Sequence, residues 1–190
     1  MNVQSRYPTT PDEFLRWNEG REGKREFVNG RVVEMMINVT ENHYRLAGRL
    51  LVQLAGQLDD SQFVVGSADF GVSTRDGVRF PDVMVHKPGD GRRLATNSPL
   101  LIAEVLSVSS MADDFGPKAE DYLALQTLEH YLVLSQDDVR IWLWSRLEDR
   151  TWSKPALIEN LVEPLQLPGL GVSLNLEKLY AGIATVRPRS

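Results

Sequence analysis

Two carboxylates lie inside stretches that otherwise have the pattern of β-strands. Asp82 follows Pro81 and precedes apolar residues, and Glu104 interrupts the nearly continuous apolar run 99–106. A charge in an apolar strand is costly unless it is paired or binds a cation, so Glu104 needs a partner. Lys118 lies on the helix predicted next. Two carboxylates on neighbouring strands, followed by this lysine, predict a divalent metal site beside a positive charge.

The predicted site suits the hydrolysis of a phosphate ester. Carboxylate oxygens can hold Mg²⁺ and leave positions for water and a phosphate oxygen. A metal bound there lowers the pKa of its water and stabilises the charge that develops on phosphorus. Lys118 would orient the attacking water or offset phosphate charge, and Tyr122, at i+4, shares its helix face.

Each of these residues also has a structural explanation. An acid in a strand is more often part of an ion pair than a metal ligand, and a helical lysine is usually solvated. Glu26, beside Lys24 and Arg25, could form a cross-strand ion pair, and a lone histidine such as His43 more often packs or caps. The combination of both strand carboxylates with a lysine on the next helix is more informative than its parts.

Composition restricts the class of protein. The 190 residues suggest one domain, 1–190, and the chain contains no cysteine and only three histidines, which excludes disulfides and argues against zinc sites of the usual kind. No apolar run reaches the roughly 18 residues that cross a bilayer, and the first residues lack a signal-peptide pattern, so we expect a cytoplasmic protein with no membrane partner.

The charge balance argues mildly against nucleic acid as a ligand. The net charge is −5, whereas nucleic-acid binders are usually basic. Some of the acids could be metal ligands, however, and a local cluster of basic residues is predicted. Its members are Arg75, Arg79, Lys87, Arg92 and Arg93.

Local signals predict alternating strands and helices. Thr10 and Thr40 can each cap a helix, and the helix that Thr40 caps is predicted at 38–59. Asn29-Gly30 is the strongest short signal for a β-hairpin. These elements give an α/β (α+β) fold with a mixed sheet flanked by helices. The remaining elements are predicted as strands at 63–73, 79–85, 100–106, 131–134 and 139–144 and as helices at 117–126 and 174–181.

Three motifs resemble those of a known family. They are Pro81-Asp82, then L-L-I-A-E-V-L-S at 100–107, then D-x-x-x-K-x-x-x-Y at 114–122. Together they resemble the Uma-family restriction endonucleases, a branch of the PD-(D/E)xK nuclease superfamily. The early R-E-F-V-N-G-R-V-V-E-M and the late L-P-G-L-G-V-S-L-N-L-E-K-L-Y extend the resemblance over nearly the whole chain.

The resemblance assigns roles to individual residues. It makes Asp82 and Glu104 the metal-binding acids and Glu26 the hairpin acid that completes the metal shell or orients a ligand. In the orthodox superfamily pattern a lysine lies two residues after the second acid, where this chain has Leu106. The family is similar in supplying the lysine from the next helix, which makes Lys118 the replacement.

The same resemblance includes Asp114 and Tyr122 as partners of that lysine, and it implies a restriction-endonuclease-like sheet flanked by helices. The implied activity is hydrolysis of DNA by water activated by Mg²⁺ or Mn²⁺. A homodimer is also implied, because cutting both strands needs two sites.

Two alternatives remain open. One is a binding or scaffold protein that keeps the metal pocket with little or no catalysis, which the acidic charge favours. The other is a metal-dependent hydrolase of small phosphate esters. A nuclease needs a positively charged groove that leads to Asp82 and Glu104, whereas a hydrolase of small esters needs a closed pocket.

Overall fold

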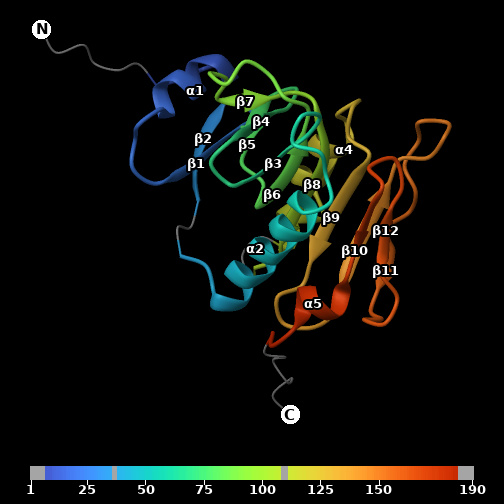
Figure 1. Ribbon diagram of the computed structural model, residues 1–190. Coiled ribbons are helices and arrows are strands. Elements are labelled where there is room, and N and C mark those ends of the chain that lie inside the picture. Colours follow the sequence, from blue (N-terminus) through green and yellow to red (C-terminus); the bar gives the residue numbers. More distant parts are fainter. Residues whose placement is uncertain (1–6, 36–37, 108–110, 184–190) are drawn as a thin grey trace, which may run out of the picture.

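The computed structural model describes residues 7–35, 38–107 and 111–183 and is built around a six-stranded sheet (Figure 1). The strand order is β11-β10-β9-β8-β6-β3. Strands β8 and β9 run parallel, and the other neighbours are antiparallel. The strands are β3 (Val64–Ser67), β6 (Val83–His86), β8 (Pro99–Val105), β9 (His130–Leu134), β10 (Ile141–Ser145) and β11 (Ala156–Ile158).

A second sheet holds the N-terminal hairpin, in the order β2-β1-β5-β4-β7. The hairpin turns at Asn29 and Gly30, whose φ angles of 49° and 77° are those of a type I′ turn. A two-stranded third sheet lies near the C-terminus. The strands are β1 (Lys24–Val28), β2 (Arg31–Met35), β4 (Gly71–Ser73), β5 (Gly77–Arg79), β7 (Ala95–Thr96), β12 (Leu165–Leu167) and β13 (Val172–Leu174).

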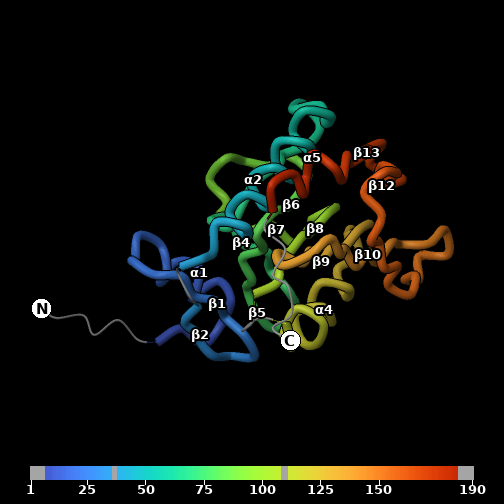
Figure 2. The backbone as a smooth tube through the Cα atoms, turned by 90° about the horizontal axis from the view of Figure 1, so that it is seen from below, coloured from blue at the N-terminus to red at the C-terminus, as the bar shows by residue number. Residues whose placement is uncertain are grey.

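Helices cover both faces of the six-stranded sheet. Figure 2 shows α2 and α5 on one side of the central strands and α4 on the other. Helix α2 buries Leu46, Leu50 and Leu54, which repeat at i+4. Within the described ranges, none of the helices combines the length and apolar character needed to span a bilayer. The helices are α1 (Pro11–Asn18), α2 (Glu41–Ala55), α3 (Met111–Asp114), α4 (Pro117–Leu123) and α5 (Leu176–Tyr180).

The predicted fold class is confirmed, and so are the local signals. Thr10 caps α1 and Thr40 caps α2, each by accepting a backbone N–H three residues on. The predicted mixed sheet is the six-stranded one, and the other described strands form two further sheets that the sequence did not indicate. Strands β11, β12 and β13 and the short β7 have no counterpart among the strands predicted from the sequence.

Two predicted strands are each broken in two. The stretch predicted at 63–73 forms β3 and β4, and the stretch predicted at 79–85 forms β5 and β6. In each case the two strands belong to different sheets. The second break falls at Phe80-Pro81-Asp82. Proline has no N–H to give to a sheet, so the chain leaves one sheet there and enters the other. Residues 1–6, which belong to the segment predicted to lack a signal peptide, lie outside the described part of the chain.

Candidate active site

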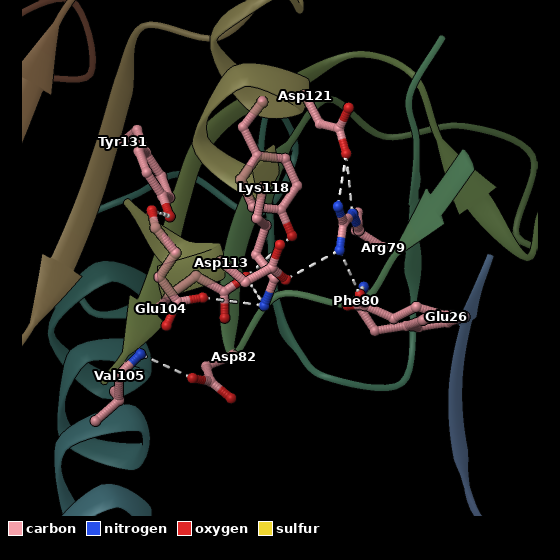
Figure 3. A network of polar contacts seen from close by, with 12 residues as sticks. Glu26, Arg79, Phe80, Asp82, Glu104, Val105, Asp113, Lys118, Asp121 and Tyr131 are labelled. Atoms are coloured by element: carbon pink, nitrogen blue, oxygen red, sulfur yellow. Dashed lines mark hydrogen bonds and ion pairs between the residues drawn. The ribbon is translucent and has the colours of Figure 1, made fainter. Parts of the chain in front are cut away.

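The sheet register brings Asp82 and Glu104 together. Val83 of β6 pairs with Ala103 of β8 in an antiparallel register, and continuing it by one residue places Asp82 opposite Glu104. Residues directly opposite each other on antiparallel strands project from the same face. The backbone N–H of Val105 donates to Asp82 Oδ2 at 2.8 Å, which fixes the first carboxylate beside the second strand (Figure 3).

Helix α2 supplies the second contact of Asp82. His43 Nε2 lies 3.1 Å from Asp82 Oδ1, and the first turn that carries His43 is held by the Thr40 cap. Each oxygen of this carboxylate therefore has one protein contact and keeps further lone pairs for another ligand. His43, an additional site candidate for which packing or capping was the more common expectation, lies beside Asp82.

Helix α4 places two polar side chains on Glu104. The hydroxyl of Tyr122 donates to Glu104 Oε1 at 2.9 Å, and Lys118 Nζ lies 3.5 Å from the same oxygen. Lys118 Nζ also lies 3.1 Å from Asp114 Oδ1. The prediction that Lys118 and Tyr122 share a helix face is confirmed, and the structure brings both of them and Asp114 to the second carboxylate.

The surroundings of Glu104 carry excess negative charge. Burial raises the pKa of the Glu104 carboxyl well above its usual range; Lys118 opposes this rise, and repulsion from Asp82, Asp114 and Glu26 adds to it. Glu104 is only 4% exposed, so water screens little of this repulsion. A proton or a cation taken up at Glu104 would relieve it.

Lys118 and Tyr122 keep their protons in this environment. Burial by itself lowers the pKa of the Lys118 ammonium, but attraction to Glu104, Glu26 and Asp114 outweighs it, and the pKa lies well above its usual range. Burial also raises the pKa of the Tyr122 phenol, and the nearby carboxylates raise it further. Lys118 is therefore a fixed positive charge, and Tyr122 is a neutral hydrogen-bond donor.

A buried arginine, Arg79, organises the rest of the site. The guanidinium of Arg79, 3% exposed, contacts Glu26 at 2.9 Å, Asp113 at 3.1 Å and Asp121 at 2.8 Å. Attraction to these three acids outweighs burial and raises the pKa of Arg79. Glu26 also accepts the N–H of Phe80 at 3.2 Å. The contacts join β1, α3 and α4 to the segment that leads into Asp82 (Figure 3).

Arg79 therefore does not belong to the predicted basic cluster, and the expectation that it does is wrong. Its side chain is enclosed by acids and cannot reach a polyanion outside. A signal was present in the sequence: an arginine next to Gly77-Val78 and Phe80 in an apolar strand needs a partner as much as Glu104 does.

Replacing Arg79 with methionine is expected to lower the free energy of unfolding by about 3 to 5 kcal/mol, because it leaves the buried Glu26 carboxylate without its cation. Urea unfolding followed by circular dichroism measures the change. Arg75→Met is the matched control, because the side chain of Arg75 is 91% exposed and its ion pair with Asp76 lies at the surface. Equal stability of the two variants would contradict a structural role for Arg79.

Comparison with known proteins identifies the family of this chain. The sequence model of the Uma2 family, described as "Putative restriction endonuclease", matches residues 11–177. This chain belongs to the Uma2 family. The resemblance found in the motifs is thereby confirmed.

Relatives of this Uma2 chain include two uncharacterized proteins of Synechocystis sp. One, slr1290, is 29% identical over 181 residues, which cover 92% of this chain and 93% of the relative. The other, sll1609, is 30% identical over 149 residues, which cover 75% of this chain and 84% of the relative. A crystal structure described as "a putative nuclease belonging to DUF820" from Anabaena variabilis has a TM-score of 0.72 and 13% identity. It covers 91% of this chain and 98% of its own, and it shows a shared fold.

In this Uma2 chain an apolar residue, Leu106, stands two residues after Glu104, where the superfamily pattern has a lysine. Leu106 is buried, and its carbonyl accepts the side-chain amide of Gln136. Gln136, which the sequence analysis did not single out, also contacts Thr40 and accepts the Asn42 amide on its own carbonyl at 3.0 Å. It joins the end of β8 to the start of α2, so it holds the two sides of the site together.

The donors present suit a divalent metal held by few protein ligands. Among residues 7–35, 38–107 and 111–183, no three His, Cys, Asp or Glu side chains form a metal-binding group. Glu26 therefore finds no support as a third ligand, and its oxygens contact Arg79 and Phe80 instead. Mg²⁺ is commonly held by one or two carboxylates with waters and substrate phosphates completing the shell. Asp82 and Glu104 match that requirement.

Proposed function

We propose that the protein is an endonuclease that depends on Mg²⁺ or Mn²⁺ and hydrolyses phosphodiester bonds of DNA with a metal-activated water. The observation that carries the proposal is the buried Glu104 opposite Asp82, in surroundings with more negative than positive charge. A divalent cation at this place would offset the repulsion that the buried carboxylate meets. Membership of a nuclease-like family and the nuclease-like fold support the choice of substrate.

Each residue has a defined part in this reaction. Asp82 and Glu104 would hold the cation, which when bound supplies an acidified water and a positive charge for the phosphate oxygens. His43 and the Val105 N–H orient Asp82, and the Tyr122 hydroxyl orients Glu104. Lys118 stays protonated, so it stabilises negative charge on the phosphate and does not serve as a general base.

The other expectations about this protein remain predictions. They are a single domain at 1–190, a homodimer whose two sites cut the two strands, and a cytoplasmic location. The homodimer follows from the proposed reaction, since each subunit described here has one pair of carboxylates opposite each other. Sedimentation of the purified protein, alone and with a short duplex, measures this association.

Replacing Glu104 with glutamine tests the proposed metal site. The amide keeps the acceptor for Tyr122 but loses the charge, so the heat of Mn²⁺ binding in titration calorimetry should disappear. The metal-free variant should be more stable than wild type at pH 8, by about 0.5 to 2 kcal/mol, because the buried charge is gone. The pKa of Glu104 is raised on folding, so the folded state binds more protons and wild-type stability falls as pH rises above the ordinary value of 4.5.

The gain in stability should therefore vanish below that pH, where wild type is protonated in both states. Glu120→Gln, on the exposed side of α4, is the matched control and should change neither property. An E104Q variant that still binds Mn²⁺ as wild type does would remove Glu104 from the metal site. Metal binding by wild type without nicking of a supercoiled plasmid would favour a binding or scaffold protein. Cleavage only of small phosphate esters would favour a metal-dependent hydrolase of such esters.

A further inference from the structure

A patch of partly exposed apolar side chains continues the row of the two carboxylates across the six-stranded sheet. Glu104 in β8 pairs with Val133 in β9, and Val133 pairs with Trp142 in β10. Paired residues project from the same face, so Asp82, Glu104 and Trp142 share one face of the sheet. Two strand spacings of about 4.8 Å put the backbone of Trp142 about 10 Å from that of Glu104.

We call this the aromatic patch and define it as Met111, Phe115, Trp142 and Leu157. Phe115 is 37% exposed, and its ring stands edge-on to Trp142 with the ring centroids 5.0 Å apart. Leu157, 50% exposed, is the cross-strand partner of Trp142, and Met111 is 55% exposed. Phe115 directly follows Asp114, the partner of Lys118, so the patch adjoins the site. Grouped exposed apolar side chains of this kind mark binding surfaces.

A cation lies beside the ring. The guanidinium of Arg140 is 5.9 Å from the centre of the Trp142 ring and is held there by a hydrogen bond of 2.8 Å to Asp138. Its side chain is 45% exposed. An aromatic surface with an adjacent arginine is the arrangement that receives a base on the ring and a backbone phosphate on the cation.

We infer that the aromatic patch stacks an unpaired nucleobase close to the phosphate that a cation at Asp82 and Glu104 would hold. The substrate is then a single-stranded or locally unpaired nucleic acid, and the inference rests on the proposed endonuclease. In a duplex the faces of the bases are covered by their neighbours, so only an unpaired base can offer one to Phe115. A protein partner is a poorer fit, because stable protein interfaces bury about 800 Å² per partner and this patch consists of four side chains.

Fluorescence anisotropy with two labelled strands tests the inference. One strand is about 12 thymidines long, and the other has the same backbone without bases; Ca²⁺ replaces Mg²⁺ as the oxygen-bound cation, and electrophoresis confirms that the strands stay intact. Phe115→Leu should weaken binding of the thymidine strand about tenfold and leave binding of the abasic strand unchanged, because only the stacking contact is lost. Phe115→Trp, which keeps an aromatic face, should bind both strands as wild type does.

Tyr44→Leu is the matched control, because Tyr44 is an exposed aromatic residue on α2, which lies across the central strands from α4 (Figure 2), and its loss should affect neither strand. Unchanged binding of thymidines by F115L, or equal loss for both strands, would overturn the inference. Suppose that wild type and F115L cleave a duplex equally well and that neither prefers single strands. The proposed endonuclease activity then stands, and the inferred role of the aromatic patch is wrong. If wild type with Ca²⁺ binds neither single strands nor duplex, the endonuclease fails and the inference fails with it.

Discussion

Replacing Asp82 with asparagine is expected to reduce Mg²⁺-dependent cleavage of plasmid DNA by at least about a thousandfold. The loss of a metal-held charge at the reacting phosphate costs several kcal/mol, and about 4 kcal/mol corresponds to a thousandfold in rate. Asparagine keeps an oxygen that can accept the N–H of Val105, so the end of β6 should keep its place beside β8. The rate of nicking, measured on agarose gels with and without Mg²⁺, gives the change.

The loss of activity should be larger for replacement of Asp82 than for replacement of His43, the residue that orients it. His43 touches Asp82 through one ring nitrogen, and loss of such a supporting contact typically costs 10- to 100-fold in metal affinity or activity, so His43→Gln should lose about that much. Calorimetry with Mn²⁺ should show no binding to D82N and weakened binding to H43Q. If H43Q were the more damaged enzyme, His43 would be the direct ligand and Asp82 its support.

Much of the site was predictable because its strongest signals are local. A carboxylate in the middle of an apolar strand marks an unusual position in any fold, and Glu104 has this pattern. The i+4 spacing of Lys118 and Tyr122 fixes their shared face once a helix is assumed. The caps at Thr10 and Thr40 and the turn at Asn29 depend only on neighbouring backbone groups, and the structure has all three.

The contacts that the sequence did not reveal join elements far apart along the chain. Arg79 meets Asp121 across 42 positions, and His43 meets Asp82 across 39. Neither pairing leaves a periodic pattern, because each depends on how the sheets pack and not on the period of one element. The division into three sheets was missed for the same reason. Pro81 lies inside the strand predicted at 79–85, and no local pattern showed that the chain changes sheets there.

Replacing Lys118 with methionine is expected to separate metal binding from catalysis. Methionine removes a positive charge next to Glu104, so the local excess of negative charge grows and Mn²⁺ binding at pH 8 should be retained. The rate of cleavage should nevertheless fall about 100- to 1,000-fold, the typical effect of losing a group that stabilises charge in the transition state. Calorimetry and single-turnover nicking on the same preparation measure the two quantities.

Stability must be controlled in this experiment, because Lys118 is buried between Glu104 and Asp114. Removing one partner of a buried ion pair costs about 3 to 5 kcal/mol, so metal-free K118M should unfold at lower urea than wild type, and Mn²⁺ should restore part of the loss. Lys118→Arg keeps the charge and should recover more activity than K118M. A folded K118M that cleaves as fast as wild type would remove Lys118 from the reaction. A folded K118M that also loses Mn²⁺ would make Lys118 a support for Glu104, because a cation that only stabilises the phosphate has no reason to be needed before the substrate arrives.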